Sequence, residues 1–316
     1  MSADGPPASP HRYLREPSAE ARRGVLAAVL AAAIWGTVFP ISKLVMTEIP
    51  PVTLVALRML ISSLTLFVWL AARRQPLFLP RSAVRNVVLM AVIGNAFSIV
   101  AQFKGTALAG AALGSLVTTA SPLVTVAAFA LLGHEKVRVR AWLGLGVAML
   151  GVWLLSGSGG AANAAGVWWL LAAAVSWGLM GVVGGVAART HDPALLTAWA
   201  SLIAACLLGI LSPLELARQP LGALTPGALL GLLYLGTVST AGAFALWVYG
   251  VARAGAVKTT LAFFAQPVIG ATIGAVVLGE LLGPRFVAGS VLIVIGVFVT
   301  QGSARLRRAL GERITT

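Results

Sequence analysis

The stretch Gln102–Val152 reads QFKGTALAGAALGSLVTTASPLVTVAAFALLGHEKVRVRAWLGLGVAMLGV, and its pattern returns without a gap 145 residues later as Trp247–Val297. An upstream pair, Trp35-Gly36, is echoed by Trp177-Gly178. The copy preserves residues that chance rarely matches in a chain rich in Ala, Gly and Leu: Pro122 returns as Pro267, Glu135 as Glu280, and Gly105, Gly110, Gly144 and Gly151 as Gly250, Gly255, Gly289 and Gly296. The chain is therefore predicted to be an internal duplication.

The composition places this duplication in a membrane. Of the 316 residues, 59% are hydrophobic and only 10% are charged, which excludes an ordinary soluble domain. Apolar runs of about 20 residues, the length a helix needs to cross hydrocarbon, follow one another with short breaks. They predict an all-α integral membrane protein of ten transmembrane helices, at 24–46, 52–72, 84–104, 111–132, 139–157, 166–188, 194–212, 227–249, 256–278 and 285–303.

Five spans in each half make the halves inverted relative to each other, because an odd number of crossings reverses the direction of entry. Residues 24–157 and 166–303 are the predicted five-helix repeats, and the small, uncharged segment 158–165 is the linker between them. The segments 1–23 and 304–316 are predicted to be basic cytoplasmic tails, the first of them disordered. Inverted repeats are typical of transporters whose substrate site lies near the midplane.

The net charge of +14 follows the predicted topology and does not indicate nucleic-acid binding. Eighteen of the 23 Lys and Arg residues fall in segments on the side of the amino terminus, three fall on the opposite side and two lie within spans. Such a bias predicts a bacterial-type inner (plasma) membrane protein with both termini in the cytoplasm. The expected partners are the lipid bilayer and a small-molecule substrate.

Short motifs recur in a fixed order along both halves of the chain: Trp35-Gly36, Ala56-Leu57-Arg58, Pro122 followed by Glu135, Ser176-Trp177-Gly178, Gln266-Pro267 and Leu278-Gly279-Glu280. In these motifs the chain resembles the EamA group of the drug/metabolite transporter superfamily, over about residues 24–303. That resemblance implies a ten-helix exporter or permease of small metabolites and specifies no substrate. The second half departs from the pattern, since Trp199 and Ala200 stand where Arg58 would recur.

Aromatic and amide side chains within the spans are the candidate substrate contacts. Aromatic faces suit amphipathic or cationic solutes, and buried amides need hydrogen-bond partners. Helix packing and interhelical hydrogen bonding are the competing interpretations of the same side chains. The candidates are Trp35, Asn95, Gln102, Trp177, Tyr249, Phe264 and Gln266.

Three prolines within spans are candidate gating elements. Proline removes a backbone hydrogen bond and is expected to bend the helix, so Pro40, Pro122 and Pro267 predict kinks in helices one, four and nine. A static kink is the alternative for each of them. The correspondence of Pro122 with Pro267 favours a shared role.

Four charged residues are possible charge contacts. Arg58 and Lys43 lie within spans near the expected outer face, where either could bind a ligand or reach the interface. Glu135 and Glu280 follow helices four and nine, where the helix dipole disfavours a carboxylate, so each is expected to need a cationic partner; Arg285 is the nearest in sequence to Glu280.

Several chemistries lack their residues in the sequence. No Asp or Glu lies at mid-membrane, and the three histidines lie in the tail or loops, so a proton relay is not expected. We expect no enzymatic activity and neither a cofactor site nor a metal site. The sequence predicts alternating-access export of amino acids or similar amphipathic solutes, running down the gradient of the solute. A multidrug or nucleotide-sugar carrier is the alternative, and a scaffold without transport activity is a weaker one.

The charge bias predicts that the segment around Gln75 faces the cytoplasm. A Gln75→Cys variant, with Cys206 replaced, should react with a membrane-impermeant thiol reagent only after the cells are opened. Labelling of this cysteine in intact cells would contradict the predicted orientation.

Overall fold

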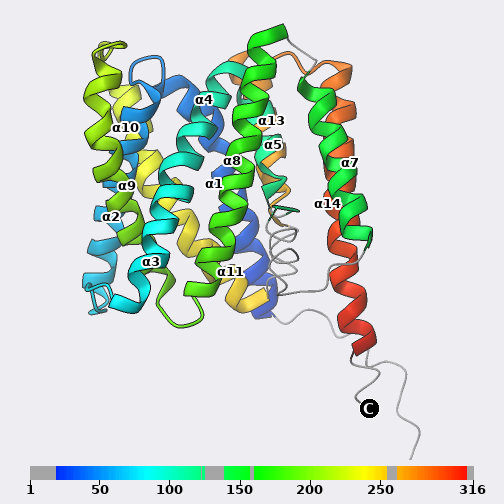
Figure 1. The fold of residues 1–316 in the computed structure, drawn as a ribbon, viewed down its shortest axis with the longest axis horizontal. Coiled ribbons are helices and arrows are strands. Elements are labelled where there is room, and N and C mark those ends of the chain that lie inside the picture. Colours follow the sequence, from blue (N-terminus) through cyan, green and yellow to red (C-terminus); the bar gives the residue numbers. More distant parts are fainter. Residues whose placement is uncertain (1–18, 122, 125–138, 157–159, 255–261, 312–316) are drawn as a thin grey trace, which may run out of the picture.

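The computed structural model describes residues 19–121, 123–124, 139–156, 160–254 and 262–311, and all of the secondary structure in these residues is helical. Figure 1 shows the helices standing side by side as a bundle. The first half contains α1 (Ala19–Val45), α2 (Pro51–Ala72), the continuous α3 (Arg81–Leu89), η2 (Met90–Ser98) and α4 (Ile99–Ala109), α5 (Ala111–Thr118) and α7 (Val139–Ser156).

The second half contains α8 (Gly160–Ala187), α9 (Pro193–Leu216), the continuous α10 (Pro226–Gly236), η3 (Thr237–Gly242) and α11 (Ala243–Ala254), α13 (Ala265–Leu278) and α14 (Pro284–Gly311). Several of these helices begin with proline, whose missing N–H and fixed φ suit the first helical position. The bundle end that contains the α1–α2 turn is called the upper end below, as it is drawn in Figure 1.

Helix length and apolar composition agree with a multi-pass membrane protein. Six helices of the described residues are long and apolar enough to cross a membrane, and shorter apolar helices lie at 142–154, 265–278 and 284–296. The all-helical duplicated fold is confirmed. The number of ten spans stays a prediction, because parts of the fourth and ninth predicted spans lie outside the described residues.

Two predicted spans are interrupted where the sequence predicted continuous helices. α5 ends at Thr118 and is followed by a turn at 119–120, although a helix was expected over 111–132. The ninth span turns at 263–264, and α13 begins only at Ala265, with Pro267 in its first turn. Pro267 is the third residue of α13, where a proline costs no internal hydrogen bond, and it does not lie in the middle of a continuous helix as the predicted kink requires.

The crossing of α7 and α14 shows that the two repeats are inverted. A Cβ added to Gly151 of α7 would lie 2.7 Å from the Gly289 carbonyl oxygen, and one added to Gly296 of α14 would contact the Gly144 carbonyl oxygen. Gly144 corresponds to Gly289 and Gly151 to Gly296 at the offset of 145. The later glycine of each helix therefore meets the earlier glycine of its repeat mate, so these equivalent helices run antiparallel.

A wider turn occurs at matching places in both halves. The π-helical η2 covers 90–98, which the offset of 145 carries to 235–243, and η3 occupies 237–242 within that range. A π segment interrupts the regular hydrogen-bond ladder and is often found at functional sites. Asn95 of η2 corresponds to Thr240 of η3.

Packing at the α7–α14 crossing leaves no room for a side chain on Gly151. We expect Gly151→Ala to destabilise the protein by roughly 1–3 kcal/mol, because the added methyl group would overpack the crossing. Gly146 of the same helix is the matched control, since nothing lies within 4 Å of a Cβ placed there. Thermal unfolding in detergent should show a lower Tm for Gly151→Ala than for Gly146→Ala, and equal values would contradict this crossing.

Candidate functional site

The π segment η3 is contacted by two of the candidate residues from the first half. The Trp35 Nε1–H donates to the Ser239 carbonyl oxygen at 3.0 Å. The Arg58 Nε–H donates to the Thr240 hydroxyl at 3.2 Å. The Ser239 and Thr240 hydroxyls both donate in turn to the Leu235 carbonyl oxygen. Adjacent residues of η3 therefore bring α1 and α2 to one place in the bundle.

Trp35, which bonds to η3, belongs to a group of three aromatic rings that contact one another. Trp35 lies 5.3 Å from Trp247 and 5.7 Å from Phe263, and the latter two rings lie 5.6 Å apart, measured between centroids. Tilted and edge-on arrangements of this kind are favourable, because the positive edge of one ring meets the negative face of another. This aromatic triangle joins α1 of the first half to α11 and to the turn before α13 in the second.

Arg58 is buried, with only 5% of its surface exposed. Its guanidinium carbon lies 5.5 Å from the centroid of the Phe103 ring. Thr240 stands at the midpoint of the helix that runs from Pro226 to Ala254. The guanidinium therefore lies in the interior, and the alternative that Arg58 reaches the outer interface is wrong.

Asn95 occupies the equivalent position in the first repeat. Its amide donates to the Ser201 hydroxyl of α9 at 3.2 Å. The two repeats thus make crossed contacts, since η2 bonds to α9 of the second half and η3 bonds to α2 of the first. Ser176 of α8 also donates to the Ile93 carbonyl oxygen of η2, much as Trp35 does to η3.

Gln266 is buried at the contact between α13 and α5. Its amide nitrogen lies 3.2 Å from the Ser115 carbonyl oxygen and 3.2 Å from the Thr118 hydroxyl. Both amide hydrogens therefore serve interhelical bonds. This arrangement supports the packing interpretation for its donors.

The remaining substrate candidates lie in different surroundings. Trp177 is 36% exposed, whereas its repeat mate Trp35 is half-buried. Tyr249 is 41% exposed, and the Arg253 guanidinium carbon lies 5.3 Å from its ring centroid. Gln102 is half-buried on α4, and Phe264 is half-buried against the apolar cluster between α5, α7 and α8.

The proline candidates are placed as follows. Pro40 is buried within α1, which stays helical on both sides of it. Pro267 is buried in the first turn of α13, and the Phe263 carbonyl oxygen accepts from the Gln266 N–H at 3.1 Å. Pro122 and Glu135 lie outside the described residues. Their predicted roles stay predictions.

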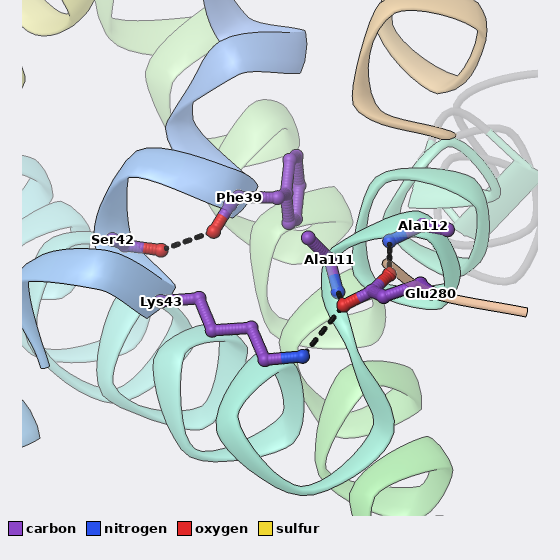
Figure 2. Close-up of polar contacts among 6 residues, drawn as sticks. All are labelled: Phe39, Ser42, Lys43, Ala111, Ala112 and Glu280. Atoms are coloured by element: carbon purple, nitrogen blue, oxygen red, sulfur yellow. Dashed lines mark hydrogen bonds and ion pairs between the residues drawn. The ribbon is translucent and has the colours of Figure 1, made fainter. Parts of the chain in front are cut away.

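At the upper end of the bundle, the Glu280 side chain contacts three groups from two helices, as Figure 2 shows. Its two carboxylate oxygens accept from the backbone N–H groups of Ala111 at 2.7 Å and Ala112 at 2.9 Å, in the first turn of α5. The Lys43 ammonium of α1 donates to the same carboxylate at 2.6 Å. Lys43 is thus an internal partner of Glu280, which the sequence had not paired with it.

The local backbone positions this carboxylate. Gly279 adopts a left-handed conformation at φ 65°, which turns the chain after α13 so that the Glu280 N–H reaches the Gly274 carbonyl oxygen at 3.0 Å. Gly110 has φ 99°, and a Cβ there would lie 2.9 Å from a Glu280 carboxylate oxygen. Only glycine satisfies both the conformation and the space at position 110.

Burial of the Glu280 carboxylate acts to raise its pKa, but the hydrogen bonds from Lys43, Ala112 and Ala111 outweigh burial. The pKa of Glu280 therefore lies below the ordinary value for a glutamate. Its position at the amino end of α5 also favours the negative charge. Glu280 is thus ionised at neutral pH.

Two further carboxylates bind helix starts at the same end. Glu215 accepts from the backbone N–H groups of Val52 at 2.9 Å and Thr53 at 2.7 Å, at the start of α2. Glu48 accepts from the Thr225 N–H at 2.7 Å, at the start of α10. Each of the three carboxylates therefore joins the start of one helix to a distant part of the chain.

Several site residues escaped the sequence reasoning. Trp247, Phe263 and Phe103 resemble ordinary apolar residues of a membrane helix, and no sequence signal marks them. Thr240 is a polar residue within a predicted span and the repeat mate of Asn95, but hydroxyls in spans more often bond between helices, so it was not among the substrate candidates. No group of three or more His, Cys, Asp or Glu side chains that could hold a metal ion occurs among the residues that the structure describes.

A family model described as the EamA-like transporter family matches the chain twice, over residues 22–157 and 164–301. The chain belongs to this family. The transporter resembles the "Probable amino-acid metabolite efflux pump" of Salmonella typhimurium, at 28% identity over 91% of this chain and 97% of the relative. It also resembles the "Probable terminal-alkyne amino-acid exporter" of Streptantibioticus cattleyicolor, at 27% identity over 92% and 96%.

A solved crystal structure shares the fold of the transporter. Its TM-score is 0.63 at 23% identity, and the match covers 88% of this chain and 97% of the other. The duplication, the membrane helices and the family membership agree. The transporter is a multi-pass membrane protein of the drug/metabolite transporter superfamily and not an enzyme.

Because the pKa of Glu280 is lowered by folding, its carboxylate stabilises the protein above the unfolded pKa of about 4, and this stability is lost as the pH falls through the folded pKa. We expect Glu280→Gln to destabilise the transporter by roughly 1–3 kcal/mol at pH 7, since hydrogen bonds to a charged group are lost. The difference in Tm between wild type and variant should shrink as the pH falls through that range.

Glu20→Gln is the matched control. Glu20 also pairs with a cation, Arg253, at 2.8 Å, but its side chain is 69% exposed, so this ion pair should contribute little. Equal Tm values for the two variants at pH 7 would show that the contact of Glu280 with α5 and Lys43 is not stabilising.

Proposed function

We propose that the transporter exports small amphipathic metabolites, most simply amino acids or similar solutes, by alternating access. Two relatives that match nearly the full length of the chain carry names of amino-acid exporters, which supports this substrate class. The proposed location is a bacterial-type inner membrane with both termini in the cytoplasm. The asymmetry of the basic residues supports this orientation.

The observation that carries the proposal is the aromatic triangle of Trp35, Trp247 and Phe263 beside η3. It places three half-buried aromatic rings beside the polar groups of a π segment. Rings attract both apolar side chains and ammonium groups. An amphipathic solute with an amine would find both interactions there.

The same place lies where helices of the two halves meet. Trp35 comes from the first half, whereas Trp247 and Phe263 come from the second. Alternating access by inverted repeats requires the halves to move against each other around the bound solute. Among the other candidates, we propose Asn95 and Gln266 as interhelical contacts near this region, and we keep Trp177, Tyr249, Gln102 and Phe264 as possible points on the route.

We further propose that transport follows the gradient of the solute. The carboxylates of the described residues stand in loops or at helix ends, as Glu48, Glu215 and Glu280 do. A proton-coupled cycle would need a group that gains and loses a proton near the solute. The interior cation, Arg58, keeps its proton under physiological conditions.

We expect Trp35→Ala to reduce counterflow of neutral amino acids in proteoliposomes by at least tenfold, which corresponds to about 1.4 kcal/mol. The reason is the loss of ring contacts and of the hydrogen bond to η3. Trp168→Ala is the matched control, because Trp168 is 62% exposed on α8, and it should transport like wild type. Equal transport by both variants would show that the aromatic triangle is not part of the substrate site.

The same vesicles test the substrate class and the energy source. Wild type that transports no amino acid of the panel, but does transport lipophilic cations or nucleotide sugars, would overturn the proposed function. An imposed inward proton gradient should leave the efflux of a neutral amino acid unchanged. Uphill efflux that collapses with a protonophore would show proton coupling instead.

A further inference from the structure

We propose that Arg58 binds the carboxylate of the transported solute. This inference rests on the proposed function and makes it narrower: the substrate carries a carboxylate, and Arg58 is the residue that selects it. The observation behind it is a buried guanidinium whose charge no carboxylate of the described residues neutralises.

The hydrogen bonds of Arg58 leave most of its donors unused. A guanidinium has five N–H donors. Within the described part of the chain, its one hydrogen bond runs from Nε to the Thr240 hydroxyl, at 3.2 Å. The two terminal nitrogens, Nη1 and Nη2, form the planar fork that binds a carboxylate through two parallel hydrogen bonds.

Within the described residues, the charge of Arg58 is compensated only weakly. The Phe103 ring, whose centroid lies 5.5 Å from the guanidinium carbon, provides a cation–π contact. That interaction is small compared with the cost of holding an unpaired charge away from water. Glu280 is already bound to Lys43 and α5, and Glu215 and Glu48 bind other helix starts.

A second polar group on the same helix face is also unsatisfied. Ser62 lies one turn beyond Arg58 on α2, and residues four apart share a face. It is fully buried, and its hydroxyl has no hydrogen-bond partner in the part of the chain that the structure describes. Within the described residues, positions 58 and 62 therefore leave hydrogen-bond donors without a partner.

The surroundings of Arg58 suit the rest of such a solute. Thr240, which contacts Arg58, is adjacent to Ser239, whose carbonyl oxygen accepts from Trp35. A carboxylate at Arg58 would therefore lie near the aromatic triangle, where an ammonium or an apolar side chain would be favoured. Arg58 would bind the carboxylate of an amino acid, and the aromatic triangle would contact its ammonium group or side chain.

The repeats provide one such cation and not two. The η2 position equivalent to Thr240 is Asn95, which bonds to the neutral Ser201. A phosphate-rich solute such as a nucleotide sugar would be expected to need several interior cations. A single guanidinium suits a single carboxylate.

A structural role is the competing explanation, in which Arg58 only holds η3 through Thr240. The experiment compares neutral L-amino acids with their carboxamides, which keep the side chain and the ammonium but lack the carboxylate. Binding to the purified, detergent-solubilised transporter is measured by thermal shift, and transport is measured by counterflow. The variants are Arg58→Gln, Arg58→Lys and the control Arg73→Gln, which removes an exposed arginine from the end of the same helix.

Wild type and Arg73→Gln should bind the best acid at least about tenfold more tightly than its carboxamide, as expected for a charge-assisted pair. In Arg58→Gln this preference should fall to within about twofold, while the carboxamide still binds as it does to wild type. Arg58→Lys, which keeps the charge but not the fork, should retain an intermediate preference.

Three results would overturn the inference: wild type that binds acid and carboxamide equally, wild type that binds no acid of the panel, or an Arg58→Gln variant that weakens both ligands by the same factor. The last result is the one a structural role predicts. Transport of acids and carboxamides alike would preserve the proposed function while removing Arg58 from recognition. Selective binding of acids without counterflow would preserve the role of Arg58 while removing the proposed function.

Discussion

The hydrocarbon core of a membrane offers no water to a backbone N–H or C=O group, so each such group needs a partner within the protein. This constraint explains why the described chain is helical. It also explains the unusual features of the bundle, because each occurs where the regular ladder of hydrogen bonds stops. Where α2, α5 and α10 start, carboxylates from distant segments accept from the free N–H groups. In the π segments, Trp35 and Ser176 donate to displaced carbonyl oxygens.

These substitute partners connect helices that belong to different halves. Glu280 joins the second half to α5 and to Lys43 of the first, and Glu215 joins α9 to α2. The opposite end of the bundle has an exposed ion pair between Glu20 and Arg253. Buried hydrogen bonds to charge are stronger than exposed ion pairs. The described contacts therefore hold the upper end more firmly.

The sequence predicted the features that depend on repetition. The matching glycines at 144, 151, 289 and 296 predicted equivalent helices, and these helices cross at the same glycines. The sequence did not predict the turn before α13, because a proline in a first turn and a proline inside a helix look alike in one sequence. The sequence suggested Arg285 as the cationic partner of Glu280, because it is the nearest cation in the chain. Lys43 is 237 residues away, and only the packing of α1 against α13 brings it next to Glu280.

The candidate site likewise combines features that the sequence predicted with features that only the packing of the helices determines. Trp35 and Arg58 were identified because aromatic and charged groups are unusual within a span, but their meeting at η3 depends on a π segment that has no sequence signature. Trp177 was assigned by analogy with Trp35, and its exposure shows that equivalent positions have different surroundings. Asn95 and Thr240 are equivalent as well, yet one bonds to a serine and the other to an arginine.

Duplication and specificity therefore impose different requirements on this chain. The crossings, the π segments and the helix starts need similar residues in both halves, because both halves solve the same problem of hydrogen bonding in lipid. Recognition of a solute needs the opposite, since a small asymmetric molecule cannot match two equal sites at once. The single interior guanidinium and the single aromatic triangle lie at η3 and have no described equivalent at η2. With the proposed site at η3, the divergence between the repeats at these positions would let a symmetric scaffold bind its substrate in one orientation.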